Sequence, residues 1–421
     1  MGRSAAGPFA VPPGGGDRET PVRVVIPKPF DYPRGLPFSA AMNPTQTQPI
    51  LAHVEPIESA PSARLTVRLG ALAANYRELI RRASPAAIAP VVKADAYSLG
   101  MGPVTQRLAA CGADTFFVAR LGEGIELRKL LPRARIFVLD GLAPATAPAL
   151  IAHRLTPVLN SREEITGWSA EARGRHTVLD AAVHIDTGMN RSGLPREDVT
   201  WLAANARAVF AHVSLALVMS HLACAGEPQH RLNREQLDRF RASLGLLPAA
   251  PASLAATAGV ELGRDYRFDI VRPGLGLYGG NPRPGRANPY RTVAVLTAEI
   301  LQVRRLETGE SAGYGAAFIA TKPATLAIAP LGYADGLIRA MGERGYAVIA
   351  GARVPFAGRI SMDLATLDVT GLPADQVQRG AAVEFLGDSV SLEDLAFAAG
   401  TINHEILTAL VPRAVRVYAE D

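Results

Sequence analysis

From Ala63 to about residue 294, the chain alternates between short apolar runs and helical stretches. Eight runs are almost continuously apolar and end in polar or small residues: AIAPVVK, DTFFVAR, RIFVLDG, LTPVLNS, AAVHIDTG, ALVMSHLA, SLAATAG and FDIVRPGLGLYGG. Amphipathic stretches such as EGIELRKLL and NREQLDRFRASLGLL lie between them. Parallel strands that are buried on both faces have this pattern, and eight β/α units form a closed barrel. The pattern therefore predicts an α/β fold with an N-terminal (β/α)8 TIM-type barrel.

The pattern changes on both sides of the predicted barrel. Residues 65–84, LTVRLGALAANYRELIRRAS, have apolar positions three and four apart and predict an amphipathic helix at its start. From about residue 295 the segments alternate apolar and polar residues between glycine turns, which is typical of β structure. Residues 1–62 are dense in proline and glycine without any period. We predict a disordered tail over 1–62, a barrel over 63–294 and a mainly β C-terminal domain over 295–421.

Composition and charge narrow the class of function. The chain is 48% hydrophobic and 20% charged, with a net charge of +5 and a pI near 9.3. It has no run of five like charges and no apolar stretch long enough to span a bilayer, so nucleic-acid and membrane binding are not expected. The two cysteines, Cys111 and Cys224, give neither a disulfide framework nor a metal-ligand spacing. With no apolar signal segment near the start, the sequence favours a cytoplasmic protein.

Polar residues follow several of the predicted strands. In a barrel of this kind the carboxyl ends of the strands face the active site. The residues at these ends are Lys93, Asp186, His221, Thr257 and Arg272. Each alone is compatible with a solvated lysine, a hydrogen-bonded structural histidine or a loop anchor, but together they form a candidate site. Asp335, in GYADG, is interpreted instead as a structural turn carboxylate.

The residue types at this mouth suggest one cofactor. A lysine in a barrel mouth near other cations has a lowered pKa and can form a Schiff base with a carbonyl compound. VRPGLGLYGG follows the eighth strand, where barrels often bind a phosphate group. These features predict pyridoxal 5'-phosphate. Arg272 as the partner of the ring nitrogen favours an unprotonated nitrogen and a weaker electron sink than an aspartate would give.

Several segments, at the right order and spacing, carry a resemblance to a known family. They are VVKADAYSLG, HIDTGMNRSG, MSHLACA, FDIVRPGLGLYG, ESAGYGAAF, LGYADG and FAGRISMD, followed by GTINHEILTAL and RAVRVY. With them, residues 63–421 resemble alanine racemase of the fold type III pyridoxal-phosphate class. The resemblance implies a barrel followed by a β domain, assembled as a head-to-tail homodimer with shared active sites. A monomer is then expected to be inactive.

The resemblance also implies roles for individual residues. Lys93 would hold the cofactor and act as one acid/base, and Tyr314 of the partner subunit would act on the opposite face. Arg272 would contact the pyridine nitrogen, and His221 would lie against the ring and orient Tyr314 and Arg272. Arg191 would hold the cofactor's phenolic oxygen and the substrate carboxylate. The remaining cofactor contacts would be Tyr97, Thr257, Gly274, Leu275 and His404, and the substrate mouth would receive Ser361, Met362 and Asp363 from the partner subunit.

Four places depart from the family pattern: His184, the pair Ala256 and Thr257, Ser361, and His404. His184 stands where many members have a carbamylated lysine that hydrogen-bonds the substrate arginine, so a bound anion or the imidazole itself would have to position Arg191. The pair keeps a hydroxyl for phosphate but loses an amide. His404 replaces a tyrosine that borders the small substrate pocket and touches the phosphate. None of these changes removes a group that transfers a proton.

The sequence thus predicts a racemase that interconverts L-alanine and D-alanine and supplies D-alanine for peptidoglycan, with no metal. Alternatives from the same residues are a racemase of broader specificity or of the serine type, and a degenerate paralogue that binds the cofactor without catalysis. A basic amino-acid decarboxylase is disfavoured by Arg272 and Tyr314. The barrel-only proteins that carry the cofactor lack a second domain, whereas about 125 residues follow the barrel here.

Overall fold

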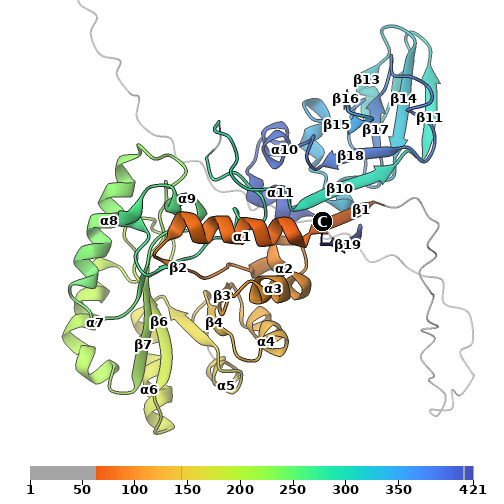
Figure 1. Cartoon of the computed structure of the whole chain (residues 1–421). Coiled ribbons are helices and arrows are strands. Elements are labelled where there is room, and N and C mark those ends of the chain that lie inside the picture. Colours follow the sequence, from red (N-terminus) through yellow and green to blue (C-terminus); the bar gives the residue numbers. More distant parts are fainter. Residues whose placement is uncertain (1–62, 144, 284, 411–412, 421) are drawn as a thin grey trace, which may run out of the picture. The chain divides into compact units, whose positions relative to one another are not determined.

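The computed structural model describes residues 63–143, 145–283, 285–410 and 413–420; the predicted disordered tail lies outside them. Eight short parallel strands form the barrel (Figure 1). They are β2 (Ala87–Ile88), β3 (Thr115–Val118), β4 (Arg135–Val138), β5 (Thr156–Leu159), β6 (Leu179–His184), β7 (Val213–Met219), β8 (Ala252–Ser253) and β9 (Ile270–Val271). Each of the eight predicted apolar runs overlaps one of them, so the predicted fold class is confirmed.

Strand pairing follows the order of the chain. Strands β3 to β8 form one parallel sheet, and β2 pairs in parallel with β9. A parallel bridge between Val91 and Phe117 joins β2 to β3, and the Arg272 N–H donates to the Ala255 carbonyl at 2.9 Å beyond β8 and β9. These contacts close the sheet, so that all eight carboxyl ends meet around one mouth.

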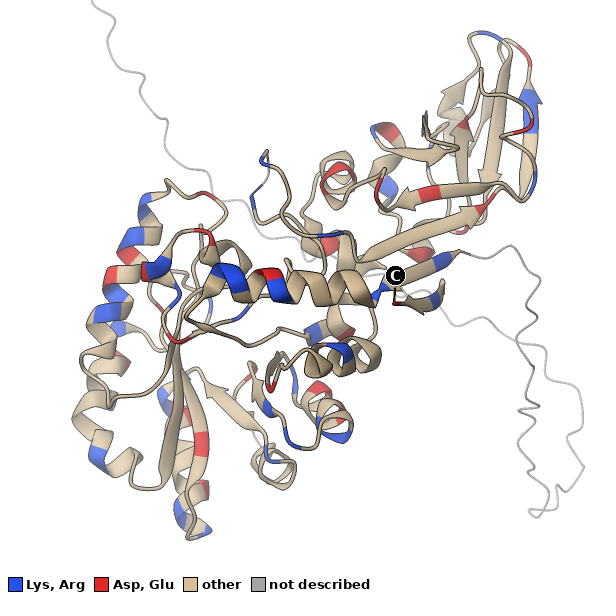
Figure 2. Cartoon of the chain, viewed as in Figure 1, with Lys and Arg blue, Asp and Glu red and all other residues tan. Residues whose placement is uncertain are grey.

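Helices lie outside the barrel strands (Figure 1). The larger ones are α1 (Leu69–Ala83), α3 (Met101–Ala110), α4 (Leu121–Leu130), α6 (Arg162–Gly174), α7 (Arg196–Val209) and α8 (Arg231–Leu244), with the shorter α5 (Ala147–Ala152), α9 (Thr257–Val260) and a 3-10 turn at Arg264–Tyr266. In the view of Figure 2, basic and acidic residues are interspersed along these helices. This mixture fits solvated helix faces better than a single-sign binding surface.

The start of the described chain differs from the prediction of one continuous helix. Arg64–Arg68 form a strand, β1, and the helix begins only at Leu69. Leu65 and Val67 alternate with more exposed neighbours, and β1 pairs with β10 and β19 of the C-terminal domain. The spacing of three and four residues was ambiguous here, because positions 65, 67 and 69 also fit the period of a strand.

The C-terminal part is mainly β, as predicted. A six-stranded sheet has the order β16-β15-β18-β10-β1-β19, and a three-stranded sheet has the order β11-β14-β17. The strands are β10 (Ala294–Glu299), β11 (Gln302–Leu306), β12 (Ser311–Ala312), β13 (Phe318–Ile319), β14 (Ala324–Ala329), β15 (Tyr346–Ile349), β16 (Ala352–Pro355), β17 (Ala365–Asp368), β18 (Ala382–Leu386) and β19 (Val415–Ala419). Two helices near the end, α10 (Leu392–Ala399) and α11 (Asn403–Ala409), pack against each other.

One large hydrophobic cluster joins the barrel interior to the six-stranded sheet, from Phe116 and Phe137 in the barrel to Leu65 and Phe385 in the sheet. Burial of such side chains contributes about 1.5–3 kcal/mol each. Within the described residues, no helix is both long enough and apolar enough to cross a membrane.

Candidate active site

Arg272 is the centre of the cluster at the carboxyl ends of the strands. It follows β9 and is 3% exposed. Its guanidinium donates to Ser253 Oγ at 2.5 Å, to the Ser220 carbonyl at 2.6 Å and to His221 Nδ1 at 3.4 Å. No carboxylate of the described residues forms an ion pair with it. Burial lowers the pKa of Arg272 to about 9, so the site holds a buried cation that is matched only by neutral groups.

His221, after β7, is held in one tautomer. Because Arg272 can only donate, His221 Nδ1 accepts and its Nε2 carries the proton. Burial, followed by the charges of Arg272 and Arg191, lowers the pKa of His221 to about 3. Gln236 of α8 is fully buried and donates to the His221 carbonyl at 2.8 Å, while its oxygen accepts from Ala223 N–H. His221 is therefore a fixed, neutral imidazole.

His184, the last residue of β6, is a second fixed neutral imidazole. The Asn160 amide nitrogen donates to the carbonyls of Leu139 and Val158, which leaves its oxygen facing His184 Nδ1 at 2.8 Å. His184 Nδ1 must then donate, and Nε2 is left as an acceptor. Burial and the charges of Arg272 and Arg191 lower the pKa of His184 to about 4. Asn160 was not found from the sequence, although it too follows a barrel strand.

Asp186 shapes the loop that bears Arg191. Its carboxylate accepts the backbone N–H groups of Gly188, Met189 and Asn190 at 2.9–3.1 Å. Arg191 itself is exposed, but its charge acts on Lys93, His184 and His221. Asp186 is thus a structural anchor of this loop, and Arg191 is on the same side of the barrel as the cluster.

Lys93 begins an unusual turn after β2. The short element α2 (Lys93–Tyr97) has left-handed backbone angles, and positive φ values run from Ala94 to Ser98. Burial, followed by the charge of Arg191, lowers the pKa of the Lys93 amine. The amine is therefore neutral at lower pH than a solvated lysine, as nucleophilic chemistry requires. The sequence predicted the lysine at this mouth but not the left-handed turn.

Tyr97, Gly274 and Thr257 come together on one side of the mouth. A Cβ at Gly274 would clash with the Tyr97 hydroxyl, so glycine lets this side chain lie close to the backbone. Thr257 Oγ1 accepts the N–H groups of Gly274 and Gly276 at 3.2 Å each. Leu275 is 8% exposed, and its N–H has no protein acceptor among the described residues. The turn thus offers a hydroxyl and a free backbone donor at one place.

His404 of α11 lies beside this turn. Its ring centroid is 6.0 Å from that of Tyr97, which also contacts the Tyr278 ring at 4.6 Å. Burial, followed by the charge of Lys93, lowers the pKa of His404. His404 therefore belongs to the Lys93 cluster although it comes from the last part of the chain.

Three predicted residues lie outside this cluster. Tyr314, in a 3-10 turn at Tyr314–Ala316, is 70% exposed and forms no side-chain hydrogen bond within the described residues. Met362 is 53% exposed, and Asp363 forms an ion pair with Arg413 at 2.8 Å. Within the described residues of this one chain, none of the three has a hydrogen bond or ion pair to the barrel cluster.

Asp335 supports the loop that contains Met362. It is 4% exposed, accepts the Gly332 N–H at 2.8 Å and pairs with Arg413 at 3.1 Å. The 3-10 turn at Tyr333–Asp335 in turn donates the Ala334 N–H to the Met362 carbonyl at 3.0 Å. This geometry agrees with the interpretation of Asp335 as a structural turn carboxylate.

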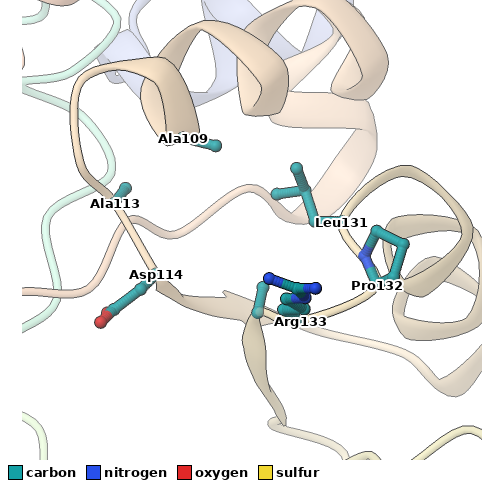
Figure 3. A pocket seen from close by; sticks show the side chains of 7 residues that line it. Ala109, Ala113, Asp114, Leu131, Pro132 and Arg133 are labelled. Atoms are coloured by element: carbon teal, nitrogen blue, oxygen red, sulfur yellow. The ribbon is translucent and has the colours of Figure 1, made fainter.

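A cavity of about 330 Å³ lies at the other end of the barrel (Figure 3). Its walls come from α3 and from the residues before β3 and β4: Ala109, Ala113, Asp114, Leu131, Pro132, Arg133 and Ala134. Active sites of these barrels face the carboxyl ends of the strands. The cavity at the amino ends is therefore not the candidate site.

Comparison with known protein families shows to which family the chain belongs. Residues 67–282 match the family described as "Alanine racemase, N-terminal domain", and residues 293–418 match "Alanine racemase, C-terminal domain". The chain belongs to the alanine racemase family. The family match covers both the barrel cluster and the separate group of Tyr314, Met362 and Asp363.

Individual members of the alanine racemase family are similar to this chain over most of its length. It is 47% identical over 362 residues to an alanine racemase of Methylobacterium nodulans, covering 86% of this chain and 97% of that protein. It is 44% identical to a catabolic alanine racemase of Agrobacterium fabrum, covering 85% and 92%. The crystal structure of alanine racemase from Bartonella henselae with covalently bound pyridoxal phosphate has a TM-score of 0.82 at 35% identity, covering 85% of this chain and all of that one.

Proposed function

We propose that this chain is a pyridoxal-phosphate-dependent racemase that interconverts L-alanine and D-alanine. The observation that carries the proposal is Arg272, a buried cation with no carboxylate partner among the described residues, in the same barrel mouth as Lys93. Its acceptors Ser253 Oγ, the Ser220 carbonyl and His221 Nδ1 are all neutral, and a neutral ring nitrogen would be a further suitable acceptor.

The residues at the mouth fit the cofactor. Lys93 would bind it covalently, and Arg272 would donate to its ring nitrogen. Its phosphate would be held by the Tyr97 hydroxyl, Thr257, and the backbone of Gly274 and Leu275. The Leu275 N–H lacks a protein acceptor among the described residues. When bound, the cofactor supplies an electron-withdrawing ring that stabilises negative charge on the substrate Cα.

Racemisation needs proton transfer on both faces of that carbon. A single base tends to return the proton to the face it left, so two groups are required. Lys93 Nζ, with its lowered pKa, would serve one face. The partner subunit's Tyr314 would serve the other, since the Tyr314 of the same chain is exposed and has no hydrogen bond to the cluster within the described residues.

A homodimer is part of this proposal. The C-terminal domain exposes several large apolar side chains: Tyr314, Ile319, Tyr333, Met362 and Leu364. Exposed apolar side chains of one region often mark an interface, and a second copy of this chain would complete the site with Tyr314, Met362 and Asp363. The cofactor cluster and the second proton-transfer group would then come from different subunits.

His184 would position Arg191 in place of the modified lysine of many relatives. Its Nε2 is an acceptor, because Asn160 holds Nδ1 as the donor. Arg191 would donate a hydrogen bond to His184 Nε2 and hold the substrate carboxylate. The imidazole is neutral above about pH 4, so it would not repel the guanidinium at the working pH.

The range of substrates would depend on His404. His404 lies near Tyr97 and Lys93, where its ring would border the substrate methyl group. A serine-type or broader specificity is the alternative that this residue favours. We also propose that the enzyme is cytoplasmic and supplies D-alanine for the cell wall. A catabolic role is the alternative, because the relative from Agrobacterium is named a catabolic alanine racemase.

The deciding experiment follows α-proton exchange in heavy water with L-Ala, L-Ser, L-Lys and L-Arg, together with the chirality of the products. We expect exchange and racemisation to be fastest with L-Ala. Lys93→Ala should lose both the cofactor's absorbance and the exchange, whereas Lys129→Ala, on the surface of α4, should keep both. Absence of exchange with all four amino acids would refute the racemase function, and an amine product from Lys or Arg would indicate a decarboxylase.

A further inference from the structure

The turn that follows Lys93 stores backbone strain. Ala94 to Ser98 have φ values from 52° to 65°, and none of the five is glycine. For L-residues the left-handed region is less favourable than the right-handed one, and they normally visit it singly. A run of five can persist only where surrounding groups hold it.

Glu123 of α4 holds the beginning of the turn. Its Oε1 accepts the Ala94 N–H at 2.7 Å, directly after Lys93. Its Oε2 accepts the N–H groups of Ala119 and Arg120, at the end of β3, at 2.8 and 3.0 Å. One carboxylate thus ties the first residue of the turn to the neighbouring strand, and its charge acts on the Lys93 amine to raise the pKa.

Asp95 and Arg416 hold the turn from the C-terminal end of the chain. Arg416 of β19 pairs with Asp95 Oδ2 at 2.7 Å, while Asp95 Oδ1 accepts the Met101 N–H at 2.7 Å. A Cβ at Gly100 would clash with the Tyr418 hydroxyl, so β19 also packs closely against the end of the turn. The last described strand therefore reaches the turn of the candidate catalytic lysine.

We infer that Glu123 and the Asp95–Arg416 pair are positioning residues that hold the left-handed turn, and thereby aim Lys93 and Tyr97 into the same mouth. The inference rests on the proposed function of Lys93. In a right-handed turn, residues four apart also share a face, but the rotation from the first side chain to the second has the opposite sense. Lys93 and Tyr97 would then point in a different direction relative to each other. With the turn held, the covalent group and the phosphate contact meet one cofactor without rearrangement.

The test measures pyridoxal-phosphate binding by Glu123→Gln and by the matched control Glu126→Gln on the exposed side of α4. The dissociation constant and the pH midpoint of the bound cofactor's absorbance are read together with the melting temperature. We expect Glu123→Gln to weaken binding about tenfold. The amide nitrogen of the new side chain would face a backbone N–H group, so that two donors oppose each other and a hydrogen bond is lost. The midpoint should move to lower pH, because a negative charge beside Lys93 is lost. The control should change neither.

A double-mutant cycle tests the second contact. Asp95→Ala and Arg416→Ala should each weaken cofactor binding, and the double variant should be no weaker than the worse single one, because both remove the same contact. Arg416→Lys, which keeps the charge, should restore part of the affinity. The exposed pair Glu171 and Arg175 gives the matched control cycle, with no effect on binding.

The outcomes separate this inference from the proposed function. Wild-type affinity and midpoint in Glu123→Gln, or in the Asp95 and Arg416 variants, would overturn the positioning role while leaving Lys93 in place. Equal loss in the control variants would also overturn it. A wild-type chain that binds no cofactor, or a Lys93→Ala variant that retains the absorbance, would instead refute the proposed function.

Discussion

The two halves of the candidate site differ in how completely one chain builds them. In the barrel, Arg272 is 3% exposed and His221 and His184 each have a single tautomer. In the C-terminal domain, Tyr314 is 70% exposed and without a side-chain hydrogen bond in the described part of the chain. The barrel half is preorganised within one chain, whereas the other half is exposed. In the proposed dimer, where a second copy completes the site, binding of a cofactor and turnover of a substrate would be separable properties.

The largest expected effect is that of Tyr314→Phe. Loss of one acid/base group should lower racemisation by about 10²–10⁴-fold, since positioned proton transfer contributes that much. Cofactor absorbance should be unchanged, because the barrel half is intact. Exchange of the α-proton should fall more from one enantiomer than from the other. The control Tyr266→Phe should behave as wild type; an equal loss there would contradict the role of Tyr314.

Mixing two inactive variants tests whether the halves come from different subunits. Lys93→Ala keeps the tyrosine and Tyr314→Phe keeps the barrel half. After random exchange of subunits, half of the dimers are mixed and each has one complete site, so about a quarter of wild-type activity should return. Each variant mixed with itself should stay inactive. A site formed within one chain would give no recovery at any ratio.

The buried histidines predict a dependence of barrel stability on pH. His221 and His184 have folded-state pKa values of about 3 and about 4, below the ordinary value near 6.5. The unfolded chain then binds more protons below pH 6.5, so this stability is complete above pH 6.5 and is lost as the pH falls toward 4. His184→Ala should reduce the loss between pH 7.5 and pH 5 by about 2 kcal/mol in urea unfolding. His176→Asn, at an exposed position, should leave the loss unchanged.

The smallest effect is expected at Arg413, which supports the Met362 loop through Asp335 and Asp363. Arg413→Ala should raise KM a few fold with kcat nearly unchanged, because it loosens a wall of the substrate mouth and not a group that transfers a proton. Arg353→Ala, on the same domain, is the control. A fall in kcat with constant KM would place Arg413 in the chemistry instead.

Much of the barrel half could be predicted from the sequence. Each of the eight apolar runs overlaps one strand, and Lys93, His221, Thr257 and Arg272 follow their strands as expected. The strand signal is strong because residues buried on both faces must be apolar. The prediction of a helix at Arg64–Arg68 was wrong because the local pattern is weak there. A five-residue segment fits two periods, and its pairing with β10 and β19 is a contact between distant parts of the chain.

The supporting residues could not be found in this way. Glu123, Asn160 and Gln236 are ordinary helix or strand-end residues by sequence, and their roles depend on which backbone groups face them. Glu123 gave a weak signal, as an acidic residue in the first turn of a helix after a strand. The left-handed turn at Ala94–Ser98 gave none, because it contains no glycine and is imposed by contacts from α4 and β19.

Sequence alone was enough to predict the scaffold and the candidate groups for chemistry, because apolar periodicity and the order of the motifs are local properties of the chain. The states of these groups came from the tertiary structure: which histidine nitrogen carries a proton, how Lys93 is aimed, and that Arg272 has no carboxylate partner among the described residues. Protonation and direction depend on burial and on neighbours far away in the sequence, and these are fixed only when the barrel closes and β19 packs against the turn that follows Lys93.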